Sequence, residues 1–248
     1  MTTRPSTRPA GEPAPPGGSP VPGPSEGTRR RLSGPAVALV LGVGLVLLTL
    51  DVIRGGAAIR LDDRVLALTP GQGNGPVVPD LLALGIVQLA TPVFSVAVVG
   101  AVTVAVCLRS GRWAPLLLAG PAIAVMSAAV LLGKDLITRS SPDVPGMLGG
   151  NGSYPSGHTA TALVCAGVAA ELVSCLRPTI RTLARAAALV WTGLVVVSLV
   201  WLHFHWLSDV VASVLLGALV LWLLLRWPLR LGAVAGPPWL GERRPRSR

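Results

Sequence analysis

Six long apolar stretches dominate this sequence and restrict what it can fold into. They lie at Pro35–Ile53, Leu81–Leu108, Ala114–Gly133, Thr159–Leu176, Ala186–Leu202 and Val210–Leu225. A helix of about 20 apolar residues crosses the hydrocarbon core of a bilayer, and a segment within lipid must satisfy its backbone hydrogen bonds internally. Since the second stretch is too long for one straight span, we expect Thr91-Pro92 to divide or kink it. The pattern predicts an all-α fold, a polytopic membrane bundle of about six transmembrane helices.

Composition agrees with a membrane protein and argues against other classes. The 248 residues are 51% hydrophobic and 13% charged, with a formal net charge of +10. Such a charge is common in nucleic-acid-binding proteins. Here, however, the arginines stand between apolar runs and in the tails, which argues for no nucleic-acid partner and favours basic loops beside membrane spans. The three cysteines have no paired spacing and are interpreted as small apolar residues.

The two ends of the chain differ from its apolar middle. Residues 1–33 are rich in Pro, Gly, Ser and Thr and are predicted to be a disordered cytoplasmic tail. Residues 34–230 are the predicted membrane domain, and residues 231–248 a second, basic cytoplasmic tail. The sequence TRRRLSG at 28–34 superficially resembles a twin-arginine export signal, but further spans follow it and no convincing small-residue cleavage site is present.

Arginine and lysine set the expected orientation. With a cytoplasmic N-terminus, the inner segments hold more of these cations than the outer ones, which contain Arg54, Arg60, Arg64, Lys134 and Arg139. By the positive-inside rule, we expect a multi-pass protein of the cell membrane with both termini in the cytoplasm. The segment Ala57–Thr69 then lies outside, as a short amphipathic helix at the membrane surface.

With this topology, the unusual polar residues of the chain meet on the extracytoplasmic side. They include all three histidines and the only lysine, and they stand where apolar stretches begin or end. These residues are Lys134, Ser156, Gly157, His158, His203, His205 and Asp209. Their convergence predicts an active or binding site on the outer face of the membrane.

Each of these residues also has a structural interpretation. Lys134 could extend its side chain from a helix end toward water, and Ser156 could be a helix N-cap. His205 and Asp209, four residues apart, could form a local pair at a helix start. His203 is interpreted as an interfacial residue without a catalytic role. Their meeting on one face favours a functional site over these separate interpretations.

The residue types suit phosphate chemistry. A helix N-terminus at Gly157 offers unpaired N–H groups and the positive end of the helix dipole to an anion, and Ser156 adds a hydroxyl donor. A histidine held by a carboxylate, as His205 by Asp209, is a nucleophile. A second histidine, His158, can act first as acid and then as base. Because no carboxylate cluster indicates a metal site, we expect neither a metal nor another cofactor.

Together these residues resemble the type 2 phosphatidic acid phosphatases, integral-membrane lipid phosphatases that share a catalytic core with the vanadium haloperoxidases. That family carries the motifs Lys-x6-Arg-Pro, Pro-Ser-Gly-His and Ser-Arg-x5-His-x3-Asp. The second motif is intact at residues 155–158, and the third keeps its end in HWLSD at 205–209, with Ser198 at the expected distance. The resemblance covers roughly residues 35–227, with the motifs in the expected order.

Two positions depart from these motifs. Lys134 and Pro142 match the first motif, but Ser141 stands where the family has arginine. In the third motif, Leu199 replaces the arginine that follows the serine. Each change removes a planar guanidinium that would bind phosphate oxygens.

The resemblance implies a metal-independent hydrolase for a lipid phosphate or diphosphate, such as undecaprenyl diphosphate, phosphatidic acid or phosphatidylglycerol phosphate. It makes His205 the nucleophile that becomes phosphohistidine, Asp209 the residue that holds its ring, and His158 the acid and base. Arg139 is expected to replace a missing arginine, and His203 or Arg64, with less support, to contribute as well. The implied phosphate-binding set is Lys134, Arg139, Ser156 and Gly157.

The sequence does not indicate an oligomeric state. It leaves two further interpretations of the function open. Without two motif arginines, the protein would be a catalytically weak or inactive family member that binds lipid head groups. The other is a transporter with Glu171 as an ionisable residue within the membrane. Glu171 is expected near the inner face, however, paired with Arg177 or Arg181.

Overall fold

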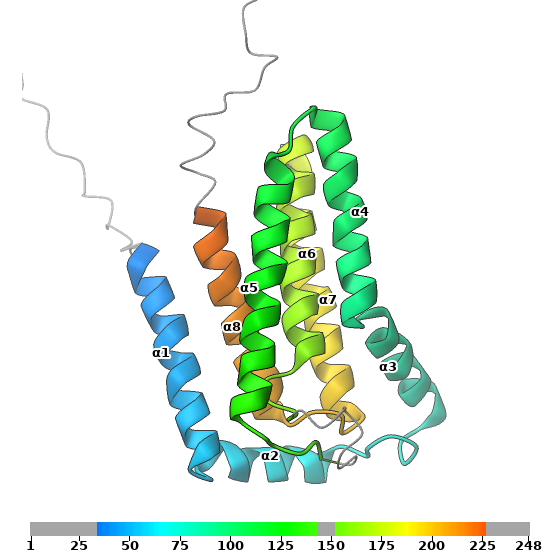
Figure 1. Ribbon diagram of the computed structural model, residues 1–248. Helices are drawn as coiled ribbons and strands as arrows, with labels where there is room; N and C mark the ends of the chain where they lie inside the picture. Colours follow the sequence, from blue (N-terminus) through cyan, green and yellow to red (C-terminus); the bar gives the residue numbers. More distant parts are fainter. Residues whose placement is uncertain (1–33, 143–151, 227–248) are drawn as a thin grey trace, which may run out of the picture. The chain divides into compact units, whose positions relative to one another are not determined.

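The computed structural model describes residues 34–142 and 152–226, which form helices joined by turns and short loops. Figure 1 shows their order. The elements are α1 (Gly34–Ile53), α2 (Ala57–Leu68), α3 (Val77–Leu89), α4 (Pro92–Ser110), α5 (Ala114–Leu136), α6 (Gly157–Leu176), the short 3-10 helix η1 (Pro178–Ile180), α7 (Arg181–Trp201) and α8 (Leu207–Arg226).

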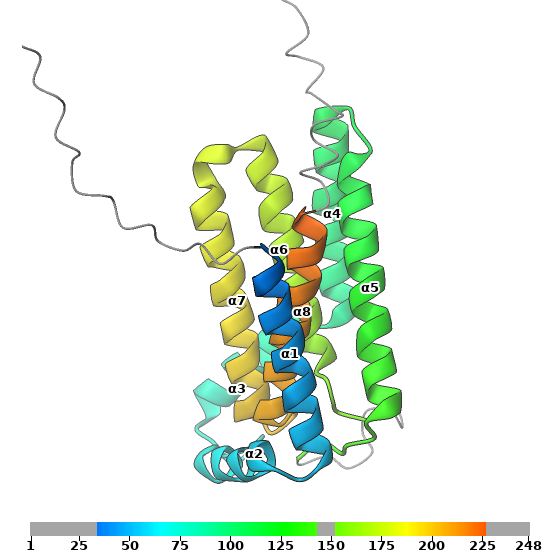
Figure 2. The ribbon, with the colours of Figure 1, turned by 90° about the vertical axis from the view of Figure 1, so that its left-hand side faces the viewer.

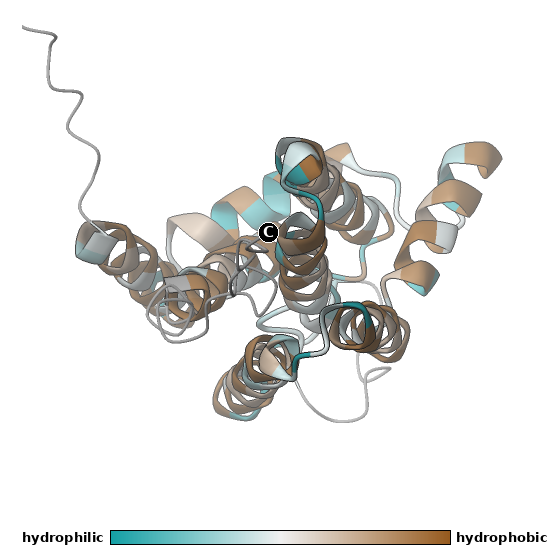
Figure 3. Cartoon of the chain, turned by 90° about the horizontal axis from the view of Figure 1, so that it is seen from above, coloured by the Kyte–Doolittle hydropathy of each residue, from teal (hydrophilic) through white to brown (hydrophobic). Residues whose placement is uncertain are grey.

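Six segments among these residues are long and apolar enough to cross a membrane: α1, α4, α5, α6, η1 together with α7, and α8. They confirm the predicted bundle of about six spans and the all-α class. Seen from above, the helix walls are mainly hydrophobic (Figure 3), as surfaces that face lipid must be. The tails predicted at 1–33 and 231–248 lie outside the described residues.

Thr91-Pro92 divides the second apolar stretch, as one of the two predicted outcomes. Helix α3 ends at Leu89, and α4 begins at Pro92 with Thr91 as its N-cap residue. Proline suits the first position of a helix, because the N–H group that it lacks has no partner within the helix at that position. In the middle of a continuous helix it would break the hydrogen-bond pattern. With 13 residues, α3 is too short to span a bilayer, and it lies beside the lower end of α4 (Figure 1).

Helix α6 is the centre of the bundle and packs against α4, α5, α7 and α8 (Figure 2). In the apolar stretch of α6 that could cross a membrane, 61% of the residues are buried, compared with 6% in that of α1. Helix α6 is therefore surrounded mainly by protein, whereas α1 faces outward. Val164 of α6 shares a core cluster with Val99 of α4 and Met126 of α5. Small residues let the helices approach closely: a Cβ at Gly217 of α8 would lie 2.9 Å from Leu163 Cδ2 of α6.

Helix α2 is amphipathic and lies across the lower ends of the long helices (Figures 1 and 2). The helix predicted over Ala57–Thr69 is present, with Thr69 as its C-cap residue. Near the end of α1, Asp51 accepts hydrogen bonds from Ala57 N at 3.1 Å and Ala58 N at 2.6 Å. Asp51 therefore satisfies two N–H groups that a helix start leaves unpaired, and fixes the corner between α1 and α2.

Near the C-terminal end of α6, Glu171 forms an ion pair with Arg185 of α7. The sequence led us to expect Arg177 or Arg181, so the predicted partner was wrong. Arg185 lies one helical turn beyond Arg181, and α7 runs back along α6, which brings that turn beside Glu171. An acidic residue that is already paired gives no support to the transporter interpretation.

Gly133, near the end of α5, touches the loop that leads into α6, and this contact predicts a difference between two substitutions on one helix. A Cβ at Gly133 would lie 2.5 Å from Pro155 Cδ, an atom of a rigid ring, whereas a Cβ at Gly120 meets nothing within 4 Å. We expect Gly133→Ala to cost about 1–3 kcal/mol of stability through overpacking. Gly120→Ala should be neutral or stabilise by up to about 1 kcal/mol, because alanine favours helix. Thermal unfolding in detergent measures both, and equal midpoints would contradict a tight contact at Gly133.

Candidate active site

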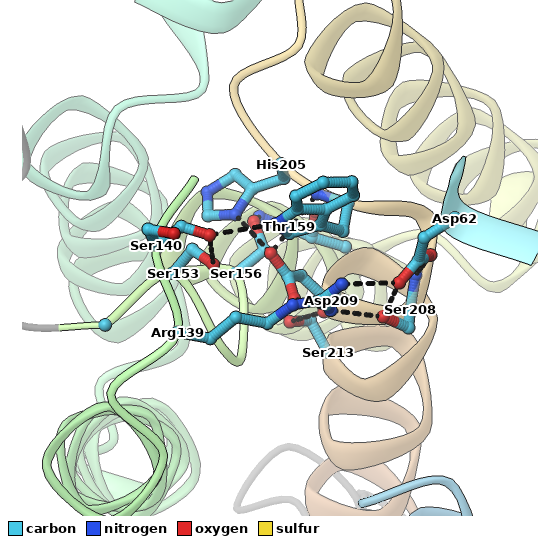
Figure 4. A network of polar contacts seen from close by, with 12 residues as sticks. Asp62, Arg139, Ser140, Ser153, Ser156, Thr159, His205, Ser208, Asp209 and Ser213 are labelled. Carbon is cyan, nitrogen blue, oxygen red and sulfur yellow. Dashed lines mark hydrogen bonds and ion pairs between the residues drawn. The ribbon is translucent and has the colours of Figure 1, made fainter. Parts of the chain in front are cut away.

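The polar residues predicted from the sequence lie on segments that meet at the lower end of the bundle in Figure 1. They come from the end of α5 and the loop after it, the start of α6, the turn between α7 and α8, and the first turn of α8. Helix α2 contributes as well. Figure 4 shows the polar contacts that join these segments, with Asp209 between His205 and Arg139.

His205 and Asp209 form the centre of the cluster. His205 Nδ1 lies 3.3 Å from Asp209 Oδ2, and the two side chains are 2% and 0% exposed. The same carboxylate oxygen accepts a hydrogen bond from Trp206 N at 3.2 Å, so Asp209 also caps the start of α8. The sequence allowed His205 and Asp209 to be either a local pair at a helix start or a histidine held by a carboxylate. The structure shows one contact that fits both interpretations. Because Asp209 holds Nδ1, the Nε2 atom of His205 is the nitrogen left for chemistry.

Ser156 is the N-cap residue of α6. Its Oγ accepts a hydrogen bond from Thr159 N at 3.3 Å, and its own N–H donates to Asp209 O at 3.3 Å. The first turn of α6 is thereby fixed against the start of α8. A Cβ at Gly157 would come no closer than 3.8 Å to any atom, Val130 Cγ1, which is an ordinary contact. Packing against the described residues therefore gives no reason for glycine at this position.

Lys134 and His158 are half-buried in the same region. Lys134 Nζ donates a hydrogen bond to Gly152 O at 2.6 Å, which ties the lysine to the loop before α6. His158 interacts electrostatically with His205 and with Lys134, and Lys134 interacts with Asp209. The structure therefore brings the lysine and both histidines together.

Arg139, from the loop after α5, binds two carboxylates. Its Nη2 donates to Asp62 Oδ2 at 2.7 Å, and its Nη1 donates to Asp209 Oδ1 at 3.1 Å and to Ser208 Oγ at 2.7 Å. The Trp206 ring covers the guanidinium, with its centroid 4.6 Å from Cζ. These bonds use three of the five guanidinium N–H groups; the other two, on Nη2 and Nε, make no hydrogen bond to the described part of the chain.

Tyr154 fixes the loop before α6 to α1. The residue is 2% exposed, and its hydroxyl lies 2.7 Å from Thr49 Oγ1. Since Thr49 Oγ1 donates its own hydrogen to Leu45 O at 2.8 Å, the Tyr154 hydroxyl is the donor between them. Burial raises the pKa of Tyr154 above its usual 10.0. Tyr154 therefore stays a neutral donor that holds the loop.

Asp62 of α2 is a candidate that our sequence analysis missed. It is 2% exposed, and its Oδ1 accepts from Ser208 N at 2.8 Å while its Oδ2 accepts from Ser208 Oγ at 2.6 Å and from Arg139. The sequence does contain a signal. Residues 58, 59, 62, 65, 66 and 69 share the less exposed face of α2, and Asp62 is the acidic one among them. A carboxylate in an inward-facing stripe indicates a buried partner.

Both departures from the family motifs are buried. Ser141 is 9% exposed, and Leu199 is fully buried in a core cluster with Val195, Leu202 and Val210. Leu199 therefore packs with apolar side chains where the motif would place a guanidinium. No group of three or more His, Cys, Asp or Glu side chains in residues 34–142 and 152–226 is arranged to hold a metal ion.

His203 and Arg64, the two further residues expected to contribute, lie in different environments. His203 is buried, and its Nε2 lies 2.8 Å from Thr69 Oγ1 and 3.1 Å from Thr69 O, which fastens the α7–α8 turn to the end of α2. It adopts φ 59, a backbone conformation uncommon for residues other than glycine. Arg64 is exposed on α2.

Comparison with known proteins identifies the family and the fold of this chain. The model of the PAP2 superfamily matches residues 88–233, more than half of the chain, and so includes all the motif positions. Among solved structures, the chain is similar to a transmembrane PAP2 type phosphatidylglycerolphosphate phosphatase from Bacillus subtilis, with a TM-score of 0.67 and 22% identity, covering 78% of this chain and 96% of that one. No curated protein matches the chain. Its fold is that of a transmembrane PAP2 phosphatase, and the chain belongs to the PAP2 superfamily.

Proposed function

We propose that this protein hydrolyses a lipid phosphate or diphosphate through a phosphohistidine formed on His205. The observation that carries the proposal is the 3.3 Å contact between His205 Nδ1 and the buried Asp209 carboxylate, beside the N-terminal end of α6. Membership of the PAP2 superfamily, a family of lipid phosphate phosphatases, supports it. The intact Pro-Ser-Gly-His motif at 155–158 supports it as well.

In the first step, Nε2 of His205 attacks phosphorus while Nδ1–H donates to Asp209, which stabilises the positive charge that develops on the ring. The bond from phosphorus to the leaving oxygen breaks, and His158 gives its proton to that oxygen. The phosphoryl oxygens gain negative charge in this step. The donors that stabilise them are Lys134, Arg139 through its two remaining N–H groups, the Ser156 hydroxyl and the Gly157 N–H.

In the second step, His158 is neutral and acts as a base. It takes a proton from water, the water oxygen attacks phosphorus, and the bond between phosphorus and His205 Nε2 breaks. Inorganic phosphate leaves, and both histidines return to their starting states. The reaction consumes one water, and no oxidant or reductant takes part.

The position of the site at the end of the bundle supports a lipid substrate. A phosphate head group at this level can reach His205 while its hydrocarbon tails stay in the bilayer. Undecaprenyl diphosphate, phosphatidic acid and phosphatidylglycerol phosphate are the candidate substrates, and the similar Bacillus subtilis structure is a phosphatidylglycerolphosphate phosphatase. The distribution of arginines supports a site on the outer face with both termini cytoplasmic.

The buried Ser141 and Leu199 favour one second candidate function, binding of lipid head groups with little or no turnover. A charge-assisted hydrogen bond contributes about 1.5–3 kcal/mol. Two that are lost and not replaced would cost about 3–6 kcal/mol, or about 10² to 10⁴-fold in rate. An assay of phosphate release from a lipid phosphate, which compares wild type with His205→Ala, separates this function from catalysis.

His205→Ala tests the nucleophile. We expect purified wild-type protein to release phosphate from at least one of the three candidate lipids, and His205→Ala to lose this activity by at least about 10³-fold, because no other group replaces the attacking nitrogen. His158→Ala should lose about 10² to 10⁴-fold. Released inorganic phosphate is the measurement. Equal background release from wild type and His205→Ala would reject catalysis and favour head-group binding.

Chelation tests the metal-independent mechanism. All the groups invoked above are protein side chains and backbone N–H groups, so we expect EDTA to leave kcat and KM unchanged. The assay compares phosphate release before and after dialysis against chelator, with added Mg²⁺ as a control for recovery. Loss of activity that a divalent cation restores would contradict the mechanism.

Arg139→Gln, with Arg64→Gln as matched control, tests the phosphate-binding role of Arg139. Removal of a charged donor to phosphate should lower kcat/KM by about 10 to 150-fold, whereas the exposed Arg64 should change it less than about 3-fold. Unfolding midpoints of both variants show whether the protein stays folded. Similar small effects of the two substitutions would reject the compensation by Arg139.

A further inference from the structure

A carboxylate from outside the family motifs reaches the centre of the site. Asp62 lies on α2, before the first residue matched by the PAP2 superfamily, which is residue 88. Its two oxygens accept three side-chain or backbone hydrogen bonds, from Ser208 N at 2.8 Å, Ser208 Oγ at 2.6 Å and Arg139 Nη2 at 2.7 Å. Asp62 and Asp209 are both almost completely buried, at 2% and 0% exposure.

Arg139 is shared between these two carboxylates. Nη2 faces Asp62, Nη1 faces Asp209 Oδ1 at 3.1 Å, and the Trp206 ring covers the plane of the guanidinium. A guanidinium prefers to place two parallel N–H groups on one carboxylate. Here the guanidinium is divided instead: Nη2 gives one N–H to Asp62, and Nη1 alone reaches Asp209. The other Asp209 oxygen, Oδ2, then stays with His205 Nδ1.

Asp62 also fixes the backbone next to Asp209. Ser208 N is one of the first N–H groups of α8, which a helix start leaves without an internal partner, and Asp62 Oδ1 accepts its hydrogen bond. Helix α2 is attached a second time nearby, because Thr69 at its end contacts His203 in the turn between α7 and α8. The Asp62 attachment leads through Arg139 to Asp209, whereas Thr69 contacts His203.

We infer that Asp62 is a positioning residue for the nucleophile: through Arg139, it keeps the Asp209 carboxylate directed at His205 Nδ1. The inference rests on the proposed function in that His205 is taken as the nucleophile. Asp62 has no contact with substrate in this role, and its effect is on the orientation and tautomer of the histidine. A merely structural Asp62 would instead hold α2 on the bundle, as Thr69 does.

Asp62→Asn and Thr69→Val separate these two roles. Asparagine keeps the size of Asp62 and can accept from Ser208 N, but it loses the charge that holds Arg139. We expect Asp62→Asn to lower kcat by about 10 to 100-fold, because a small misplacement of a reacting group can cost about 100-fold in rate, with KM changed less than about 3-fold. Thr69→Val should lower the unfolding midpoint but keep kcat within about 3-fold of wild type.

A double-mutant cycle with Arg139→Gln shows whether Asp62 acts through Arg139. If it does, Asp62→Asn has no further effect on kcat once Arg139 is glutamine. If Asp62→Asn slows the Arg139→Gln protein as much as it slows wild type, action through Arg139 is overturned. A loss of kcat that only follows a loss of stability, as judged against Thr69→Val, would overturn it too.

A readout without turnover separates this inference from the proposed function. The ¹⁵N signals of His205 in full-length labelled protein, recorded at alkaline pH where an ordinary imidazole is neutral, report which ring nitrogen carries the proton. We expect the Nδ1–H form in wild type and a shift toward mixed tautomers in Asp62→Asn. Unchanged signals would overturn the positioning role. Altered signals in a protein that releases no phosphate would support the positioning role and reject the proposed function.

Discussion

Asp209 is the residue on which the site is assembled. Its carboxylate contacts His205 on one oxygen and Arg139 on the other, and its backbone carbonyl accepts hydrogen bonds from Ser156 N at 3.3 Å and Ser213 Oγ at 2.8 Å. A fully buried carboxylate is tolerated only when such partners replace water. The burial of Asp209 therefore requires the loop after α5, the start of α6 and the α7–α8 turn to be in place together.

The lysine, arginine and aspartate side chains of the candidate site balance in formal charge. Two cations, Lys134 and Arg139, stand with two carboxylates, Asp62 and Asp209, and the two motif positions that would add guanidinium groups hold Ser141 and Leu199. In the proposed mechanism, a phosphate dianion would meet these four balanced charges and the protonated His158 instead of a strongly positive cluster. This gives more weight to the fixed N–H groups at the start of α6, whose dipole attracts an anion without adding a formal charge.

The apolar pattern predicted the fold because lipid leaves the backbone few choices. Long apolar stretches must be helices, and Thr91-Pro92 had to interrupt one of them. The site was predictable where residues adjacent in sequence act together, as with Ser156 and Gly157 or His205 and Asp209. The sequence did not reveal that α2 crosses the end of the bundle and places Asp62 against α8, because a contact 146 residues apart depends on tertiary packing. The partner of Glu171 was missed for the same reason.

Helix α1 shows how differently one transmembrane helix can be constrained along its length. Most of its side chains face outward, and 6% of the residues in its apolar stretch are buried. Its last turns, however, carry Thr49, which accepts from Tyr154, and Asp51, which caps α2. Toward its N-terminal end, where most side chains are exposed, one apolar residue can replace another with little effect on packing. In the last turns particular side chains are required, so a substitution there would disturb the support of the candidate site and not only the contact with lipid.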